Sequence, residues 1–165
     1  MDDRFRWIPL HPSHKVLQRD ANAEVQSIKG QSELKKNLVS YGLPDACRVL
    51  SAHAARHATP ILDEWANSVG KTLEEDLEHT PGVFRLEPGP QLRPPGNSTA
   101  LLTPLFTDRV DVVLCVPGAP DITNITVSWD PINLLHLPDR DIKIEKGRIT
   151  FVYTLYKLSP RSTGQ

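Results

Sequence analysis

The sequence predicts an α+β protein in which N-terminal helices pack on a C-terminal, mainly antiparallel β-sheet. Apolar residues recur every three or four positions as far as Thr80-Pro81-Gly82 and every second position after it, the periods of helices and strands respectively. Prolines number 4 in residues 1–80 and 11 in residues 81–165, where they separate short strands. We therefore expect an extended arm at 1–12, one α+β domain at 13–158 and a flexible tail at 159–165. Within that domain the expected divisions are a helical part at 13–80, a loop at 86–99 and a β part at 100–158.

Four helices are expected in the first part of the domain. The first begins at the N-cap Ser13, and a second is expected over 32–42. A third begins at Pro44-Asp45, and a fourth follows Thr59-Pro60, an N-cap before a proline at the first helical position. The fourth helix has the clearest apolar stripe, formed by Ile61, Leu62, Trp65, Ala66, Val69, Leu73 and Leu77.

Short strands are expected after the proline-rich loop. Alternating apolar residues predict strands over 101–106, 109–116 and 125–129. A hairpin follows, in which residues 142–144 and 149–156 flank a turn. The last strand is apolar or aromatic on both faces, so we expect it to lie in the middle of the sheet.

Composition excludes several classes of protein. Lysine and arginine number 19 against 20 acidic residues, which gives no overall field toward nucleic acid. Cys47 and Cys115 are expected to be buried thiols rather than a disulfide framework. The sequence shows neither the apolar run of a signal peptide nor a transmembrane segment. We therefore expect a protein of an intracellular, reducing compartment that is not secreted.

The strongest candidate for metal chemistry is a pair of histidines. His53 and His57 are four residues apart on the third expected helix, a spacing at which two imidazoles share one face. Asp63, Glu64 or His79 would have to supply a third ligand through the fold. Two exposed histidines near a helix end are the simpler explanation of the pair, so no metal, cofactor or catalytic residue is assigned.

Two surface features predict partner binding instead. The arm carries Trp7, Ile8 and Leu10, which would leave apolar surface for a partner. A basic group gathers around the final hairpin and would contact anionic lipid or nucleoprotein. It consists of Arg140, Lys143, Lys146 and Arg148.

The C-terminal part resembles a known family over about 25 residues. The segments are Leu134-Leu135-His136-Leu137-Pro138-Asp139, then Ile144-Glu145-Lys146-Gly147-Arg148-Ile149-Thr150-Phe151, and Thr154-Leu155-Tyr156. They are similar to the late strand region of rhabdovirus-type viral matrix proteins. The resemblance implies a small α+β protein that self-associates, contacts the nucleocapsid and lies under a membrane, in host cytoplasm or virion. The lysine-rich tail and proline-tyrosine motif of such proteins are missing.

Together these patterns predict a non-enzymatic structural or assembly protein. Its partners would be further copies of itself or another protein, and no small-molecule substrate is identified. Two alternatives remain open on the sequence: a small metal-dependent hydrolase centred on His53 and His57, and a cellular adaptor that binds peptides at its sheet edge.

Overall fold

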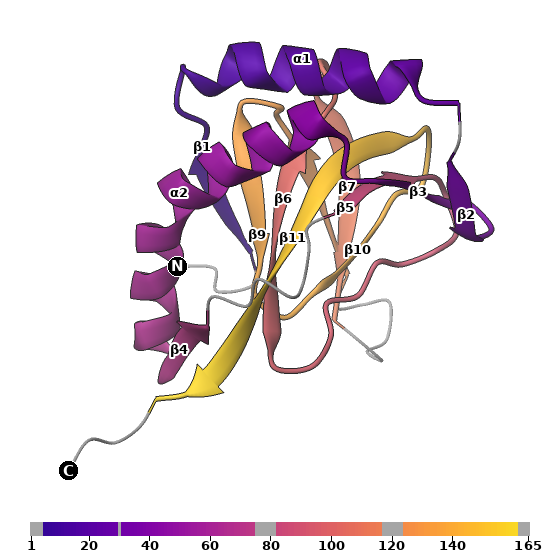
Figure 1. Ribbon diagram of the computed structural model, residues 1–165. Coiled ribbons are helices and arrows are strands. Elements are labelled where there is room, and N and C mark those ends of the chain that lie inside the picture. Colours follow the sequence, from indigo (N-terminus) through magenta and orange to yellow (C-terminus); the bar gives the residue numbers. More distant parts are fainter. Residues whose placement is uncertain (1–4, 30, 75–81, 117–123, 162–165) are drawn as a thin grey trace.

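The computed structural model describes residues 5–29, 31–74, 82–116 and 124–161, and in them the chain is mostly β-sheet. Two helices lie over one face of a large antiparallel sheet, and a small second sheet covers the other face (Figure 1). The helices are α1 (His14–Ser27) and α2 (Asp45–Ser68). The prediction of several helices packed on one C-terminal sheet is therefore wrong.

The large sheet takes strands from both ends of the chain. Its order is β1-β9-β6-β11-β5-β3-β2, and β4 pairs with the far end of β11. The strands are β1 (Arg6–Pro9), β2 (Ser32–Lys35), β3 (Leu38–Gly42), β4 (Lys71–Glu74), β5 (Gly82–Leu86), β6 (Ser98–Pro104), β9 (Asn133–Leu137) and β11 (Ile149–Pro160). As its two apolar faces predict, β11 is central and is flanked by β6 and β5.

The small sheet has the order β10-β7-β8 among the described residues. Its strands are β7 (Val110–Cys115), β8 (Ile125–Trp129) and β10 (Asp141–Lys143). The expected final hairpin is not formed as a pair, because β10 pairs with β7 whereas β11 belongs to the large sheet. The turn between them therefore links the two sheets.

The main core lies between the sheets. Residues two apart on a strand share a face, and on β11 Phe151 and Tyr153 point into this core. Trp129 of the small sheet is fully buried and lies 5.0 Å, ring to ring, from Phe106 and 6.4 Å from Phe151. Such burial supplies most of the folding free energy, at about 25 cal/mol per Å² of apolar surface.

The other face of the large sheet packs on the helices. Val152 of β11 contacts a cluster with Ala21 and Val25 of α1 and Leu50 of α2. The far end of α2 buries Leu62 in a neighbouring cluster, which also contains residues of β6 and β9. The large sheet is therefore covered on both faces, which places it in the middle of a three-layer molecule.

A hairpin replaces the second expected helix. The apolar positions of 32–42 fit a helical period, but the chain turns at Asn37, whose φ is 67°. Asparagine tolerates this left-handed conformation better than other side chains with a Cβ. The turn lets β3 pair with β5, and it buries Leu38 opposite Leu86. Long-range strand pairing thus overrides the local helical pattern.

The third and fourth expected helices are one continuous helix, α2, with Pro60 in its interior. Proline removes an N–H donor and usually breaks a helix. Here Pro60 is on the exposed side, while Ala58 and Leu62 are buried on the sheet. The Thr59 hydroxyl donates to the carbonyl of Ala55 at 2.7 Å rather than capping a new helix. Packing on both sides of the proline therefore keeps the helix continuous.

The helix ends well before residue 80. Gly70 has a φ of 72°, and the chain then forms β4, in which Leu73 pairs with Leu158. Leu77 and His79, which belonged to the expected helix or to its metal site, lie outside the described residues. No helix among the described residues is long and apolar enough to cross a membrane.

Candidate functional site

A groove runs under α1, between this helix and the loops at the adjacent edge of the sheets. Two cavities form it, with volumes of about 470 Å³ and about 700 Å³. They share four lining residues and are therefore two ends of one depression, which we call the α1 groove. The shared residues are Asn22, Leu105, Phe106 and Thr107.

The smaller end of the groove is mainly apolar. Leu10, Phe106 and Ile132 line it, and Ile132 is more than half exposed. The Gln18 side-chain amide fixes α1 here by donating to the carbonyls of Pro104 at 2.7 Å and Pro131 at 3.2 Å. These two hydrogen bonds therefore hold α1 against the loops that form the apolar wall at this end of the groove.

An aspartate organises the loop that carries this wall. Asp130 accepts hydrogen bonds from the backbone N–H of Ile132 at 3.2 Å and from the Arg109 guanidinium at 2.9 Å. These two hydrogen bonds hold the pKa of Asp130 below its ordinary value. The ionised form of Asp130 therefore stabilises the conformation of this loop through these two hydrogen bonds.

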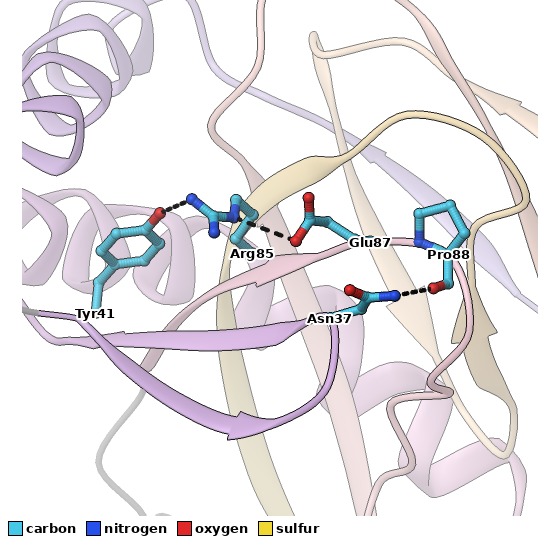
Figure 2. A network of polar contacts seen from close by, with 5 residues as sticks. All are labelled: Asn37, Tyr41, Arg85, Glu87 and Pro88. Carbon is cyan, nitrogen blue, oxygen red and sulfur yellow. Dashed lines mark hydrogen bonds and ion pairs between the residues drawn. The ribbon is translucent and has the colours of Figure 1, made fainter.

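The larger end of the groove is polar and is built on β5 and β3. Arg85 of β5 donates from Nη1 to the Tyr41 hydroxyl at 2.8 Å, and its guanidinium carbon lies 5.9 Å from the centre of the Tyr41 ring. Glu87 lies farther away, with 3.9 Å between its Oε2 and the Arg85 Nε (Figure 2). That distance is an ion pair but is too long for a hydrogen bond.

The hairpin that carries Tyr41 is fastened to the strand that carries Arg85. The Asn37 side-chain amide donates to the carbonyl of Pro88 at 2.6 Å (Figure 2). The Glu87 backbone N–H donates to the Asn37 carbonyl at 2.9 Å. Together with the pairing of β3 and β5, these bonds fix Tyr41 and Arg85 relative to each other.

The guanidinium of Arg85 has donors to spare. An arginine carries five N–H groups, and among the described residues the side chain of Arg85 makes one hydrogen bond, to Tyr41. Its buried Nε has no hydrogen-bond partner there. The side chain is one-fifth exposed, so its charge is partly withdrawn from water. Arg148, which directly precedes β11, lines the same end of the groove.

The charge of the groove is predominantly positive. Asp108 is the one carboxylate among the described residues that line it, against four lysine and arginine side chains. These cations are Lys15, Arg19, Arg85 and Arg148. Partly desolvated cations beside an apolar wall attract a ligand that has an anionic group and an apolar body.

The three arm residues predicted to bind a partner are in the sheet or the groove. Trp7 lies in β1 and packs 6.2 Å from Trp129, ring to ring. Ile8 is buried under the helices, because β1 pairs with β9 along its length. Leu10 lines the α1 groove. The free apolar arm that the prediction assumed is therefore an edge strand, and partner binding by these residues stays a prediction.

The four basic residues that were predicted to bind a partner differ in their exposure to solvent. Arg140 is buried, Lys143 is half-buried, and Lys146 and Arg148 are exposed. Of the four, Arg148 lines the groove. Contact with lipid or nucleoprotein through this group remains an untested prediction.

His53 and His57 do share a face of α2, and two further histidines join them. His11 and His14 approach from the start of α1. Nevertheless, the residues that the structure describes contain no group of three histidine, cysteine or carboxylate side chains that could hold a metal ion. Asp63 and Glu64 continue the same helix and add no third ligand. The metal-dependent hydrolase is therefore not supported.

No protein-family model matches the sequence, and no curated protein matches it either. Among solved structures the chain is similar to the non-heme alpha ketoglutarate dependent epimerase SnoN from nogalamycin biosynthesis. The TM-score is 0.60 at 11% identity, and the match covers 99% of this chain and 83% of that chain. At this identity the likeness shows the fold alone. It agrees with a sheet-rich fold, as found in an enzyme, rather than with N-terminal helices packed on a C-terminal sheet.

The comparison also corrects the functional expectation. A non-enzymatic structural or assembly protein was expected, but the fold is shared with an enzyme. These comparisons do not test the resemblance to viral matrix proteins.

The metal chemistry of non-heme enzymes does not transfer to the described residues. Such enzymes hold iron through two histidines and a carboxylate. Here the space between the sheets is filled by apolar side chains such as Leu102, Leu114 and Phe151. His136 of β9 points to the other face, where Trp65 of α2 lies 4.7 Å from it, ring to ring. The described residues therefore offer no such iron site between the sheets.

Sequence reasoning missed the groove. Its central residue, Arg85, stands in Val83-Phe84-Arg85-Leu86, a strand that is otherwise apolar. A charged residue inside such a strand was an available signal, because charges are seldom buried without a purpose. Tyr41 was assigned to a helix, so nothing in the sequence placed it beside Arg85.

Proposed function

We propose that this chain binds a small organic anion, with a carboxylate as its charged group and an apolar body, in the α1 groove. Arg85 carries the proposal, because it is a partly buried cation with unused donors at the polar end of a groove whose other end is apolar. The volume of about 700 Å³ at that end lies in the range of small-molecule sites.

The chemistry of each end suits one part of such a ligand. The planar guanidinium of Arg85 can donate two parallel hydrogen bonds to a carboxylate, and the Tyr41 hydroxyl holds it in place. Arg148 adds a second positive charge. Leu105 and Phe106, which line both ends, would contact the apolar body. Binding would also give the Arg85 charge a closer counter-ion than Glu87 at 3.9 Å.

The test measures binding of matched carboxylate and amide probes by calorimetry and by ligand-observed NMR. Phenylacetate and octanoate are the anionic probes, and phenylacetamide and octanamide are the matching neutral ones. We expect an anionic probe to bind at least about tenfold more tightly than its amide, because hydrogen bonds to a charged group contribute about 1.5–3 kcal/mol. Saturation-transfer signals should be strongest on the apolar part of the probe.

Substitutions locate the binding. Arg85→Gln and Arg148→Gln should each weaken binding of the carboxylate about tenfold or more. Lys146→Gln is the matched control, because it removes a positive charge from the same turn as Arg148 but outside the groove. It should change the affinity less than about twofold. The proposal is wrong if no carboxylate binds the folded protein, or if Arg85→Gln binds as tightly as the native chain.

A further inference from the structure

Four of the six histidines of the chain gather where α1 begins against α2. His11 precedes α1, His14 is its first residue, and His53 and His57 are one turn apart on α2. The ring centre of His14 lies 5.8 Å from that of His57 and 6.1 Å from those of His11 and His53. His11 also lies 6.1 Å from His57. We call these four side chains the histidine cluster.

Two rings of the cluster form hydrogen bonds with the backbone near the start of α1, and that of His11 requires a neutral imidazole. Nδ1 of His11 accepts from the Ser13 backbone N–H at 3.2 Å and lies 2.8 Å from the Ser13 hydroxyl, so it carries no proton. Nε2 of His57 is 3.1 Å from the carbonyl of Pro9, which can only accept, so this nitrogen carries one. The cluster thereby connects the end of β1, the start of α1 and the middle of α2.

His14 is the ring that can least accept a charge. It is 3% exposed, and its Nδ1 has no hydrogen-bond partner among the described residues. Burial first, and then the neighbouring imidazoles of His57, His53 and His11, lower the pKa of His14, while a backbone hydrogen bond to His53 opposes them. Among the described residues, no carboxylate contributes to this change in the pKa of His14.

The position on the helix adds to the cost of a charge. The N-terminus of a helix carries a partial positive charge, which disfavours cations in the first turn. The first turn of α1 contains no acidic residue, and Lys15 follows His14 directly. On α2, Arg56 precedes His57. The charged side chains next to the cluster in sequence are thus cationic as well.

We propose that the histidine cluster is an acid-sensitive latch, in which neutral imidazoles hold the start of α1 against α2 and protonation of the cluster in acid releases it. A proton on His11 would remove the acceptor of the Ser13 N–H, and a proton on His14 would place an unpartnered charge in the interior. The opening is local, because Ala21 and Val25 anchor the rest of α1 through the apolar cluster with Leu50. This inference does not depend on the proposed ligand.

Amide hydrogen exchange tests the latch on the full chain. Exchange is measured at about pH 7.5 and about pH 5.5, with correction for the intrinsic dependence of the rate on pH. We expect the protection of residues 11–18 to fall at the lower pH, because a protonated cluster loses the contacts that hold the start of α1 against α2. The protection of residues 21–27 should change much less. Equal protection of residues 11–18 at both pH values would overturn the proposal.

Two variants separate the latch from general loss of stability in acid. His14→Phe keeps an aromatic ring that cannot titrate, and it should remove the local effect of pH. His136→Gln removes the buried histidine outside the cluster and should keep that effect. If His14→Phe does not fold, His53→Gln with His57→Gln removes two of the repelling imidazoles and should move the opening to lower pH. A local effect of unchanged size and midpoint in the cluster variants would also overturn the proposal.

Discussion

Acidification should destabilise this protein through one buried histidine, His136. The ring is fully buried on β9 beneath Trp65 of α2. The Thr99 hydroxyl lies 2.7 Å from its Nε2 and donates to the carbonyl of Leu137 at 3.1 Å, so Nε2 must be the nitrogen that donates to Thr99. The second proton, which converts the ring to an imidazolium, would then bind Nδ1, and this nitrogen is buried without a hydrogen-bond partner among the described residues.

The magnitude follows from the difference in pKa between the folded and the unfolded chain. Burial, with a smaller contribution from the charge of Arg6, lowers the pKa of His136 from 6.5 to about 3. Between these values the unfolded chain binds a proton that the folded chain does not, so stability falls as the pH falls. Integration gives a loss of about 2 kcal/mol between pH 7 and pH 5, and of about 3 kcal/mol by pH 4. A domain of this size has only about 5–15 kcal/mol in total.

The assay is urea unfolding followed by tryptophan fluorescence at pH 7, 6 and 5, on the native chain and on His136→Gln. Glutamine retains a donor for the Thr99 hydroxyl but does not titrate. The native chain should lose about 2 kcal/mol more than the variant between the two extremes, equivalent to about 4–8 °C in Tm. Lys146→Gln, at an exposed position outside both the histidine cluster and the surroundings of His136, is the control and should behave as the native chain does. An equal loss of stability in His136→Gln and the native chain would refute the reasoning.

Three further substitutions or treatments test the packing of the helix layer. Pro60→Ala should stabilise the protein by about 1–2 kcal/mol in chemical unfolding, because it restores a helical N–H at an exposed position inside α2, and an unchanged or lower stability would contradict this account. Leu62→Ala should cost about 2–5 kcal/mol, since Leu62 is fully buried between α2 and the sheet, whereas Val16→Ala at a half-exposed site of α1 should cost less than about 1 kcal/mol. Burial, followed by the charge of Glu24, raises the pKa of the Cys47 thiol to about 12, so alkylation near pH 8 should label Cys47 only in denaturant, and rapid labelling of the folded protein at this residue, located by peptide mass, would disprove its burial.

Local sequence patterns predicted correctly those strands whose tertiary environment favours the same secondary structure as their residues do. Strand β8 alternates apolar and polar residues, strand β7 is apolar except at Asp111, and both form close to the expected bounds. Central β11 has two apolar faces because it is covered on one side by the helices and on the other by the small sheet. In these segments the burial imposed by the tertiary structure follows the same period of apolar residues that the sequence shows.

The predictions of secondary structure were wrong where pairing with a strand distant in sequence determines the conformation. Residues 32–42 have helical spacing, yet they form a hairpin because β5 offers Leu38 a buried place opposite Leu86. Residues 71–74 extend the apolar stripe of α2, but Gly70 turns the chain and β4 pairs with the end of β11. The sequence did not predict the candidate site for the same reason. Tyr41 and Arg85 are 44 residues apart in sequence and meet only through the pairing of β3 with β5.

The amino-acid sequence by itself determined where the chain can bury apolar surface: the stripe of α2, the two faces of β11, the apolar run of β7 and the alternation of β8. It also brought His11 near His14 and His53 near His57, since these pairs are local. Only the tertiary structure decided that the two pairs face each other, that Arg85 lies at the polar end of a groove, and that the arm is a strand. The physical reason is that each of these depends on strand pairing and layer packing between residues far apart in the chain, which no local period encodes.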